Sequence, residues 1–472
     1  MSKRVFIKTV GCQMNVLDSE MVIADLKRHG YTLVDSAAEA DCVFYNTCSV
    51  REHAEEKVYS ALGRVREQKK KNPEKLIGVM GCMAQKDQKI IFDRAPYVDM
   101  VVGPGQLHTI PDLLEKVRNG EGRQMAVSLG RKDGTQANIA RSHETFDPLR
   151  DPSMRPTPFQ AYLRIQIGCD KFCTYCVVPN TRGPEQGRPP TQIISEARIL
   201  AEQGCREITL LGQTVNSYRF KEGDTTTDMS ALLEQLHEVD GIDRIKFVTN
   251  YPKDMTERLL VTVRDLPKVS PYLHVPAQSG SDEVLKRMKR GYTIADYMEM
   301  FERIERIMPD AAVSSDFIVG FCGETEDDFQ KSVKLIQRCR FKNSFIFQYS
   351  VRPGTKASER LEDDVPKEVK VRRNNELLEV QNTVSKEDNL KMCGKVVEVL
   401  VEGPSKKGRK TESTEDGIVQ MTGRTHCDRI VVFDGNQRQA GQLMSIHVDD
   451  ATNNTLIGRV QTVEVVSIGG LG

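Results

Sequence analysis

One short loop of the chain carries three cysteines, Cys169, Cys173 and Cys176, in the spacing Cys-x3-Cys-x2-Cys. Thiolates packed on one loop are soft ligands of the kind that iron–sulfur clusters use. Clusters that only transfer electrons take four cysteine ligands, so three would leave one iron open to a ligand from outside the protein. An open coordination position is typical of a catalytic metal site, a rule stated for zinc that we extend to iron by analogy. The spacing therefore predicts a catalytic iron–sulfur cluster, and a zinc site with a distant fourth ligand is the alternative.

A second set of three cysteines, Cys12, Cys48 and Cys82, lies in the first part of the chain. Short apolar runs alternate there with helical patterns up to about residue 125, which predicts an open parallel α/β sheet. The predicted strands are Arg4–Val10, Asp41–Thr47, Leu76–Met80 and Met100–Val102, and the predicted helices are Ser19–His29 and Glu52–Lys71. Each of the three cysteines follows a strand, at the carboxyl edge where such sheets bind ligands. They could converge on one site, or each could be a small buried hydrophobic residue, and the pattern alone leaves both open. Cys42, inside its strand, is expected in the core.

The Cys169 loop follows the first strand of a repeating series. Strands and helices alternate after a proline-rich linker, which predicts a partial (β/α)6 barrel with its active site at the carboxyl ends of the strands. The predicted strands are Ala161–Ile167, Glu207–Leu211, Arg244–Val248, Tyr272–Val275, Ala312–Val319 and Ser344–Tyr349. Polar residues at or near these ends, and the aromatic residue beside Cys176, are the candidate site residues Gln213, Asn216, Thr249, Gln278, Ser279, Asp316 and Tyr175. Loops are polar in any case, so the argument holds for the group rather than for each member.

The end of the chain has a different pattern. Pro366–Asn389 is predicted to be a connecting helix, and short alternating apolar runs with Gly and Asn between them follow, which predicts a small β-barrel. A loop between the first two runs carries Lys406, Lys407, Arg409 and Lys410. A basic loop tip can bind phosphates, and a solvated turn is the alternative.

The composition limits the possible functions. A chain of 472 residues exceeds what one core serves, so two or three domains are expected. Lys+Arg and Asp+Glu are both 67, so a nucleic-acid site would have to be local. We expect a cytoplasmic protein, because no apolar run suits a membrane span or a signal peptide. Twelve cysteines in such a chain favour metal binding or catalysis over disulfides.

Several stretches of the chain resemble one enzyme family. They are KTVGCQMNVLDSE, NTCSVREHAEEKVYSALG, GCMAQ, IGCDKFCTYCVVPNTRG, LLGQTVNSY, HVPAQSGSDEVLKRMKRGYT and YSVRPGT, and they span residues 8 to 355. The three-cysteine loop resembles that of the radical-SAM enzymes, and the whole set resembles the radical-SAM methylthiotransferases. The chain from about Asn389 is similar to the TRAM domain. Within the family, GCQMN favours the branch that acts on isopentenyl-adenosine in tRNA.

The resemblance implies a specific set of cofactors and partners. Cys169, Cys173 and Cys176 would be catalytic and would hold a 4Fe–4S cluster that chelates S-adenosylmethionine (SAM), and Cys12, Cys48 and Cys82 would hold a second, auxiliary 4Fe–4S cluster. One SAM would be the radical source and another the methyl donor for a methylthio group added to the prenylated adenosine beside the anticodon. SAM contacts are expected among the strand-end residues and Tyr175, and tRNA contacts at the basic loop. We also expect an electron donor such as a flavodoxin, no membrane contact and a monomer.

The implied domains are 1–125 with the auxiliary cluster, a linker at 126–158, the radical-SAM core at 159–388 and the TRAM domain at 389–468. Two residues depart from the family pattern: Cys322 replaces an expected proline, and Thr214 replaces an expected Asn or Asp. The first alternative function is another branch of the family, acting on threonylcarbamoyl-adenosine in tRNA or on a ribosomal-protein aspartate. The second is a non-catalytic iron–sulfur carrier.

Overall fold

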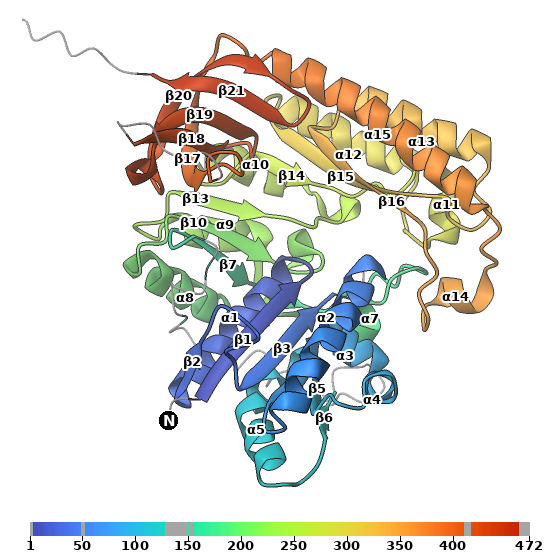
Figure 1. Cartoon of the computed structure of the whole chain (residues 1–472). Helices are drawn as coiled ribbons and strands as arrows, with labels where there is room; N and C mark the ends of the chain where they lie inside the picture. Colours follow the sequence, from blue (N-terminus) through green and yellow to red (C-terminus); the bar gives the residue numbers. More distant parts are fainter. Residues whose placement is uncertain are drawn as a thin grey trace, which may run out of the picture.

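The computed structural model describes residues 3–48, 52–127, 150, 155, 157–409 and 417–461, with no side chains for 52–55. Three parts follow one another along the chain: an N-terminal α/β domain, a central strand–helix barrel and a C-terminal β-barrel (Figure 1). This arrangement confirms the predicted fold class. No helix in the described residues is both long and apolar enough to cross a membrane.

The N-terminal domain is built on a six-stranded parallel sheet in the order β2-β1-β3-β4-β5-β6. Its strands are β1 (Lys3–Val10), β2 (Tyr31–Leu33), β3 (Cys42–Thr47), β4 (Leu76–Gly81), β5 (Met100–Val102) and β6 (Gln124–Ala126). The four strands predicted from the sequence are present, and the two others are edge strands of three residues each. Both faces of the central strands are buried, including Cys42, because helices cover the sheet on both sides.

The helices of this domain are α1 (Gln13–Arg28), α2 (Glu52–Lys71), α3 (Cys82–Asp87), α4 (Lys89–Arg94) and α5 (Ile110–Arg118). The prediction for α1 was wrong at its start, which lies six residues before Ser19. Its N-cap is Cys12, whose carbonyl accepts hydrogen bonds from the backbone N–H groups of Asn15 and Val16. The first turns of α1 bury polar residues such as Asn15 and Asp18, so the amphipathic pattern that would mark a surface helix is missing there.

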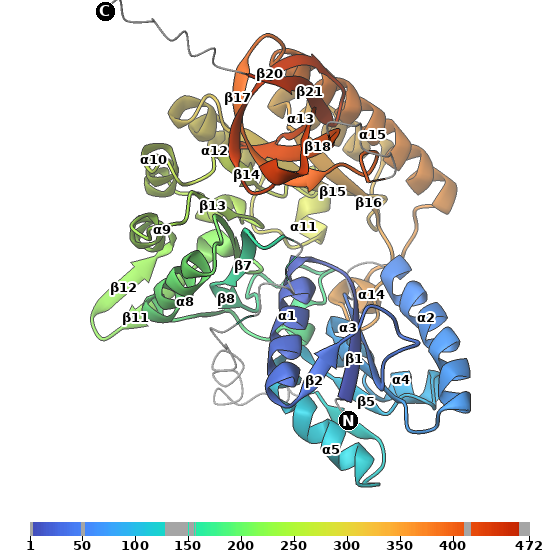
Figure 2. The same ribbon diagram turned by 60° about the vertical axis from the view of Figure 1, so that its left-hand side comes forward.

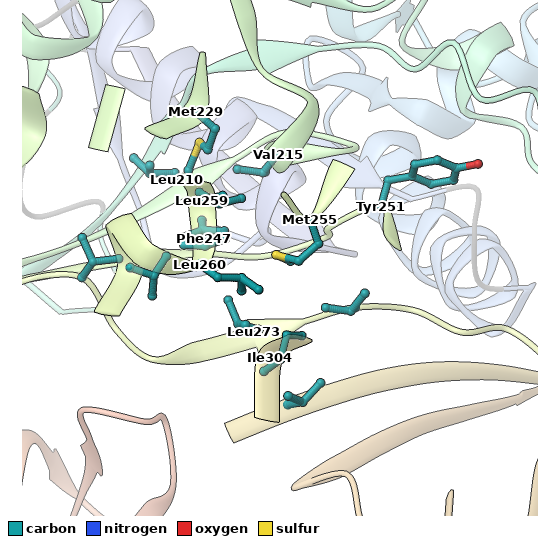
Figure 3. Close-up of a cluster of buried hydrophobic side chains, with 14 of the residues drawn as sticks. Leu210, Val215, Met229, Phe247, Tyr251, Met255, Leu259, Leu260, Leu273 and Ile304 are labelled. Carbon is teal, nitrogen blue, oxygen red and sulfur yellow. The ribbon is translucent and has the colours of Figure 1, made fainter. Parts of the chain in front are cut away.

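The central domain is a partial barrel of six strands that form two three-stranded parallel sheets, with a helix after each strand. The strands are β7 (Gln160–Arg164), β10 (Glu207–Leu211), β13 (Arg244–Phe247), β14 (Tyr272–His274), β15 (Ala312–Val319) and β16 (Asn343–Gln348). The helices are α8 (Pro190–Glu202), α9 (Met229–His237), α10 (Glu257–Asp265), α12 (Ile294–Ile307), α13 (Glu326–Cys339) and α15 (Lys367–Leu390). One hydrophobic core between strands and helices holds the domain together, with Leu210, Phe247, Leu260 and Ile304 among its members (Figure 3).

The C-terminal domain is a closed barrel of five strands. They are β17 (Val396–Pro404), β18 (Ile418–Thr425), β19 (Ile430–Asn436), β20 (Leu443–Ala451) and β21 (Thr455–Val460). Its β18–β19 turn docks on the amino-terminal side of the central barrel, where Asp428 pairs with Lys246 at 3.0 Å and with Lys342 at 3.3 Å. This turn does not cover the opposite side of the central barrel, where the carboxyl ends of the strands lie.

Helix α1 joins the N-terminal domain to the central barrel. Its apolar residues Met14, Leu17 and Met21 pack with Leu211 of β10, while α8 and α9 cover the other face of that strand. In Figures 1 and 2, α1 accordingly lies between the N-terminal sheet and the first barrel strands. The carboxyl edge of the N-terminal sheet is therefore held close to the central barrel.

Candidate functional site

The N-terminal cysteine trio, Cys12, Cys48 and Cys82, lies at one edge of the sheet because its strands end in register. Val10 of β1 is paired with Thr47 of β3, and Thr47 is paired with Gly81 of β4. The three cysteines follow these paired positions by one or two residues. Of the two alternatives that the sequence left open for these cysteines, the strand register supports convergence on one site.

The electrostatics of this trio depend on a residue from another domain, Arg182. A hydrogen bond with Cys48 lowers the pKa of Cys12 to about 6, and the charge of Arg182 acts in the same direction. Burial raises the pKa of Cys82, while Arg182 opposes that rise through its charge and a side-chain hydrogen bond. Arg182 directly follows α7 (Val178–Thr181), which itself follows the Cys169 loop. The chain segment that follows the second cysteine loop therefore supplies a charged side chain to the first trio.

The second trio, Cys169, Cys173 and Cys176, is held by the loop after β7 and β8 (Gln166–Ile167). Burial raises the pKa of Cys169 to about 11 and that of Cys176 to about 12, and the neighbouring thiols add to both shifts. Arg290 donates a hydrogen bond from Nη1 to Sγ of Cys173 at 3.2 Å. The thiols of Cys169 and Cys176 therefore keep their protons near neutral pH, and iron binding would have to release them.

The donor sets of both trios suit an iron–sulfur cluster better than a single metal ion. Within the described ranges, no three His, Cys, Asp or Glu side chains are arranged to bind one metal ion together. A cluster makes a different demand, because each thiolate binds a separate iron. Each trio offers three free cysteines with interacting charges, a soft donor set that fits three irons of a cluster.

Hydrogen bonds connect the loops at the carboxyl ends of the barrel strands into one rim. Thr249, after β13, donates from Oγ1 to the carbonyl of Gly212, after β10, at 2.9 Å. The Cys169 loop joins this rim through Lys171, whose Nζ lies 2.7 Å from a carboxylate oxygen of Asp254. The cysteine loop and the predicted strand-end residues therefore belong to the same side of the barrel.

The predicted SAM-contact residues occupy this rim in different ways. Asn216 uses its whole side-chain amide on the backbone of Tyr251, donating at 2.8 Å and accepting at 2.7 Å, so it fixes two loops to each other. Thr249 and Gln278 adopt left-handed backbone conformations, with φ of 63° and 72°, which is uncommon outside glycine and typical of functional sites. Ser279 is buried and accepts a hydrogen bond from the backbone of Ser281.

The remaining predicted contacts differ in what their side chains touch. Tyr175 packs edge-on against Phe321, with ring centroids 6.3 Å apart. Gln213 has a buried side-chain oxygen without a hydrogen-bond partner in the described part of the chain. Asp316 accepts a hydrogen bond from Nε2 of His274 at 3.0 Å.

The two residues that depart from the family pattern have partners of their own. Thr214 donates from Oγ1 to Oε2 of Glu185 at 2.9 Å. Cys322 is buried in a small apolar cluster that also contains Tyr349 and Phe321. Its position is explained by packing.

Of the basic loop, Lys406, Lys407 and Arg409 are exposed, while Lys410 lies outside the described residues. Arg409 donates from Nε to the carbonyl of Pro404 at 3.2 Å, which orders the start of the loop. The structure thus places three of the four residues on the surface of the C-terminal barrel.

Sequence reasoning missed several residues of the site. Asp18 binds Arg182 through both guanidinium nitrogens, at 2.6 and 3.3 Å, and both residues are buried. Phe345 and Phe347 of β16 are exposed to 48% and 38% although they are aromatic strand residues. The arginine Arg290 beside Cys173 was also missed. Asp18, Arg182 and Arg290 do lie inside the motif stretches that carried the family resemblance, which was the available signal.

Phe345 and Phe347 line the inner face of the barrel. In the parallel register, Phe345 is paired with Asp316, and Phe347 with Ile318. The alternate residues Phe317 and Ile346 pack into the core under the helices. Phe345 therefore faces the barrel interior, where its ring meets that of His274 edge-on at 6.2 Å.

Models of three known families match successive parts of the chain. A model described as "Uncharacterized protein family UPF0004" matches residues 4–103, the radical SAM superfamily matches residues 163–336, and the TRAM domain matches residues 390–461. Each match falls on one of the three parts of the fold.

Among solved structures, the chain is similar to the radical S-adenosylmethionine methyltransferase TsrM from Kitasatospora setae. The structure of TsrM with cobalamin and a [4Fe-4S] cluster bound has a TM-score of 0.56 and 12% identity, covering 76% of this chain and 77% of that one. At this identity the likeness shows the fold alone.

Relatives with similar sequences cover the whole chain. A protein of Rhodopirellula baltica is 78% identical over 99% of this chain and 98% of its own length, and one of Delftia acidovorans is 45% identical over 98% of this chain and 99% of its own. Both are named tRNA-2-methylthio-N(6)-dimethylallyladenosine synthase. The chain therefore belongs to the family of the tRNA-2-methylthio-N(6)-dimethylallyladenosine synthases, which are radical-SAM methylthiotransferases.

Proposed function

We propose that this radical-SAM enzyme adds a methylthio group to an isopentenyl-adenosine next to the anticodon of tRNA. The observation that carries the proposal is a cysteine trio at each of two carboxyl sheet edges, with Arg182, from the segment after the second trio, acting on the first trio. The named relatives support the same reaction. An aromatic C–H bond has no useful acidity, so its cleavage calls for radical chemistry of the kind that cofactors supply.

The proposal includes two 4Fe–4S clusters and SAM. Cys169, Cys173 and Cys176 would hold the cluster that binds SAM, and Cys12, Cys48 and Cys82 would hold the auxiliary one. Together with SAM, the clusters would supply one-electron chemistry and a methylated sulfur. The part of this chain is then to hold the groups in contact, since positioning supplies much of the catalysis.

We place SAM along the rim, near Tyr175, Gln213, Thr249, Gln278 and Ser279, with Asn216 as a positioning residue. Only one carboxylate oxygen of Asp316 is used in the hydrogen bond with His274, and the Asp316 side chain is 24% exposed, on the inner face of the barrel. A carboxylate is a suitable partner for a cationic amino group. The exposed rings of Phe345 and Phe347 would contact the substrate base and its prenyl group.

The tRNA would be held in part by the basic loop Lys406, Lys407, Arg409 and Lys410. We also propose a one-electron donor such as a flavodoxin. The clusters are the only redox-active groups proposed for this chain, so a separate protein would have to supply their electrons. The chain would act as a monomer in the cytoplasm, where tRNA is modified. Sedimentation of the loaded enzyme with and without tRNA tests the oligomeric state.

The function is tested with the full chain, reconstituted without oxygen and assayed by counting iron and sulfide. We expect two clusters per chain, and nucleoside mass spectrometry should show the methylthio group on prenylated tRNA after addition of SAM and a reductant. Two parallel reactions contain threonylcarbamoyl-adenosine tRNA and a ribosomal protein with the alternative aspartate target. Product in either of these, and none on prenylated tRNA, would assign the chain to another branch.

A further inference from the structure

A buried ion pair joins the N-terminal domain to the central barrel beside the auxiliary cysteine trio. Asp18 of α1 accepts hydrogen bonds from both terminal guanidinium nitrogens of Arg182, and neither side chain is more than 2% exposed. Helix α7, which Arg182 directly follows, packs against α3, whose first residue is Cys82. The arginine accordingly forms a hydrogen bond with Cys82, and its charge acts on Cys12. Arg182 therefore contacts a carboxylate and one cysteine of the trio at the same time.

The pair places a guanidinium and a carboxylate close to the trio, and the two act in opposite directions on the thiols of Cys12 and Cys82. Arg182 is protonated at all accessible pH values, and Asp18 accepts two hydrogen bonds from its guanidinium. Hydrogen bonds and charges next to the cysteine sulfurs are among the means by which proteins tune iron–sulfur clusters. Charges in a buried setting are weakly screened, so each one has a large effect at contact distances.

We infer that Arg182 and Asp18 form an electrostatic control of the auxiliary cluster, in which the arginine stabilises the reduced, more negative cluster and the aspartate moderates that effect. The inference rests on the proposed two-cluster function. Arg182 is a positioning residue, because it acts through Cys82 and not on the substrate. Its place on the chain, directly after the helix that follows the Cys169 loop, means that the radical-SAM domain itself supplies this control to the N-terminal domain.

The matching residue at the other cluster provides a control. Arg290 is also buried, and it donates to Sγ of Cys173 at 3.2 Å. It also donates to the hydroxyl of Tyr292 at 3.0 Å, so it has no carboxylate partner comparable to Asp18 among the contacts that the structure gives it. A change at Arg290 should affect only the radical-SAM cluster.

The test is an anaerobic redox titration of the reconstituted full chain, with the two clusters followed by electron paramagnetic resonance. Arg182→Gln should make the auxiliary cluster harder to reduce, by a factor of ten or more in the reduction equilibrium, which is about 59 mV for one electron. Asp18→Asn should make the same cluster easier to reduce, because the arginine is then uncompensated. Arg290→Gln should shift only the other cluster.

Arg182→Gln and Asp18→Asn break the same ion pair, so a purely structural role would change the reduction potential of the auxiliary cluster in the same direction in both variants. Shifts in opposite directions would therefore indicate electrostatic control. Equal shifts, or unchanged potentials with both clusters present, overturn the inference. If Arg182→Gln does not retain the auxiliary cluster, Arg182→Lys and Asp18→Asn decide: the lysine variant should stay near the wild-type potential, and the asparagine variant should still move to easier reduction. A wild-type protein with one cluster would instead overturn the proposed function, which iron counting before the titration reveals.

Discussion

His274 and Asp316, on the neighbouring strands β14 and β15, share a hydrogen bond of 3.0 Å between Nε2 and Oδ1. The backbone N–H of Thr249 donates to the other ring nitrogen of His274 at 3.3 Å, so Nε2 carries the hydrogen that Asp316 accepts. The orientation of the Asp316 carboxylate is thereby fixed by a histidine that was not among the candidate site residues.

The first prediction follows from this orientation. Asp316→Asn should weaken SAM binding by about ten- to a hundredfold, because a hydrogen bond to a charged group contributes roughly 1.5–3 kcal/mol. Equilibrium binding of SAM to the reconstituted enzyme measures this. Asn216→Ala is the comparison variant. The Asn216 amide is bonded to the Tyr251 backbone, so this variant should lower the melting temperature and have a smaller effect on SAM affinity than Asp316→Asn. Unchanged affinity in Asp316→Asn would remove Asp316 from the site.

The two cysteine trios should have separate tasks. Cys173→Ala should abolish reductive SAM cleavage, because it removes a ligand of the SAM-binding cluster. Cys48→Ala should retain part of that cleavage and lose methylthio insertion. Chromatographic detection of 5′-deoxyadenosine and nucleoside mass spectrometry give the two readouts. A Cys48→Ala protein with an intact SAM-binding cluster and no cleavage would contradict the separation.

The strands and helices of the barrel were predictable because each is a short apolar run or an amphipathic repeat. The strand Ala312–Val319 has the bounds expected from the sequence. The start of α1 was not predictable in this way, because Asp18 and Glu20 are polar residues buried by partners far along the chain, Arg182 and Arg150. The inward direction of Phe345 likewise depends on the pairing of β16 with β15, which a single strand does not reveal.

The contact between the C-terminal and central barrels should be sensitive to acid. Burial lowers the pKa of His426 from 6.5 to about 4, and its Nε2 lies 3.1 Å from the carbonyl of Val269. Below about pH 6.5, His426 binds a proton in the unfolded chain, whereas in the folded chain it does so only near pH 4. The free energy of unfolding is therefore unaffected by this group above pH 6.5 and decreases as the pH falls from 6.5 to 4, by about 3 kcal/mol at most. Thermal melting between about pH 7.5 and pH 5 measures the decrease. His426→Gln can still donate to Val269 and does not titrate, so its pH dependence should be smaller.

The basic loop should contribute to tRNA binding by neutralising phosphates. Replacing Lys406, Lys407, Arg409 and Lys410 with glutamine should flatten the salt dependence of affinity, by about 0.7–0.9 in the log–log slope for each phosphate that is no longer neutralised. Binding titrations over a range of salt concentrations measure the slope, and an unchanged slope would identify the loop as a solvated turn. Deleting the whole domain is a poorer test, because it leaves Lys246 and Lys342 without Asp428.

The prenyl group of the substrate should be a required handle. The target base cannot reach the barrel interior while it is stacked in the anticodon loop, so it must be flipped out, at a cost of a few kcal/mol. Burying a five-carbon chain at about 0.8 kcal/mol per carbon contributes roughly 3–4 kcal/mol as an upper bound. The two energies are similar in size, so unmodified tRNA should react about two orders of magnitude more slowly than prenylated tRNA. Single-turnover rates on the two tRNAs without oxygen measure the ratio.

Phe345 allows this preference to be traced to the protein. Its ring is half exposed on the inner face of the barrel, so Phe345→Ala removes apolar contact surface without opening a cavity in the core. The variant should react more slowly with prenylated tRNA and change little on unmodified tRNA, so the ratio between the substrates shrinks. Leu378→Ala, which truncates an exposed apolar side chain on α15, should leave the ratio unchanged. If Phe345→Ala slowed both substrates equally, the ring would contact the base rather than the prenyl chain, and equal wild-type rates on the two tRNAs would remove the handle altogether.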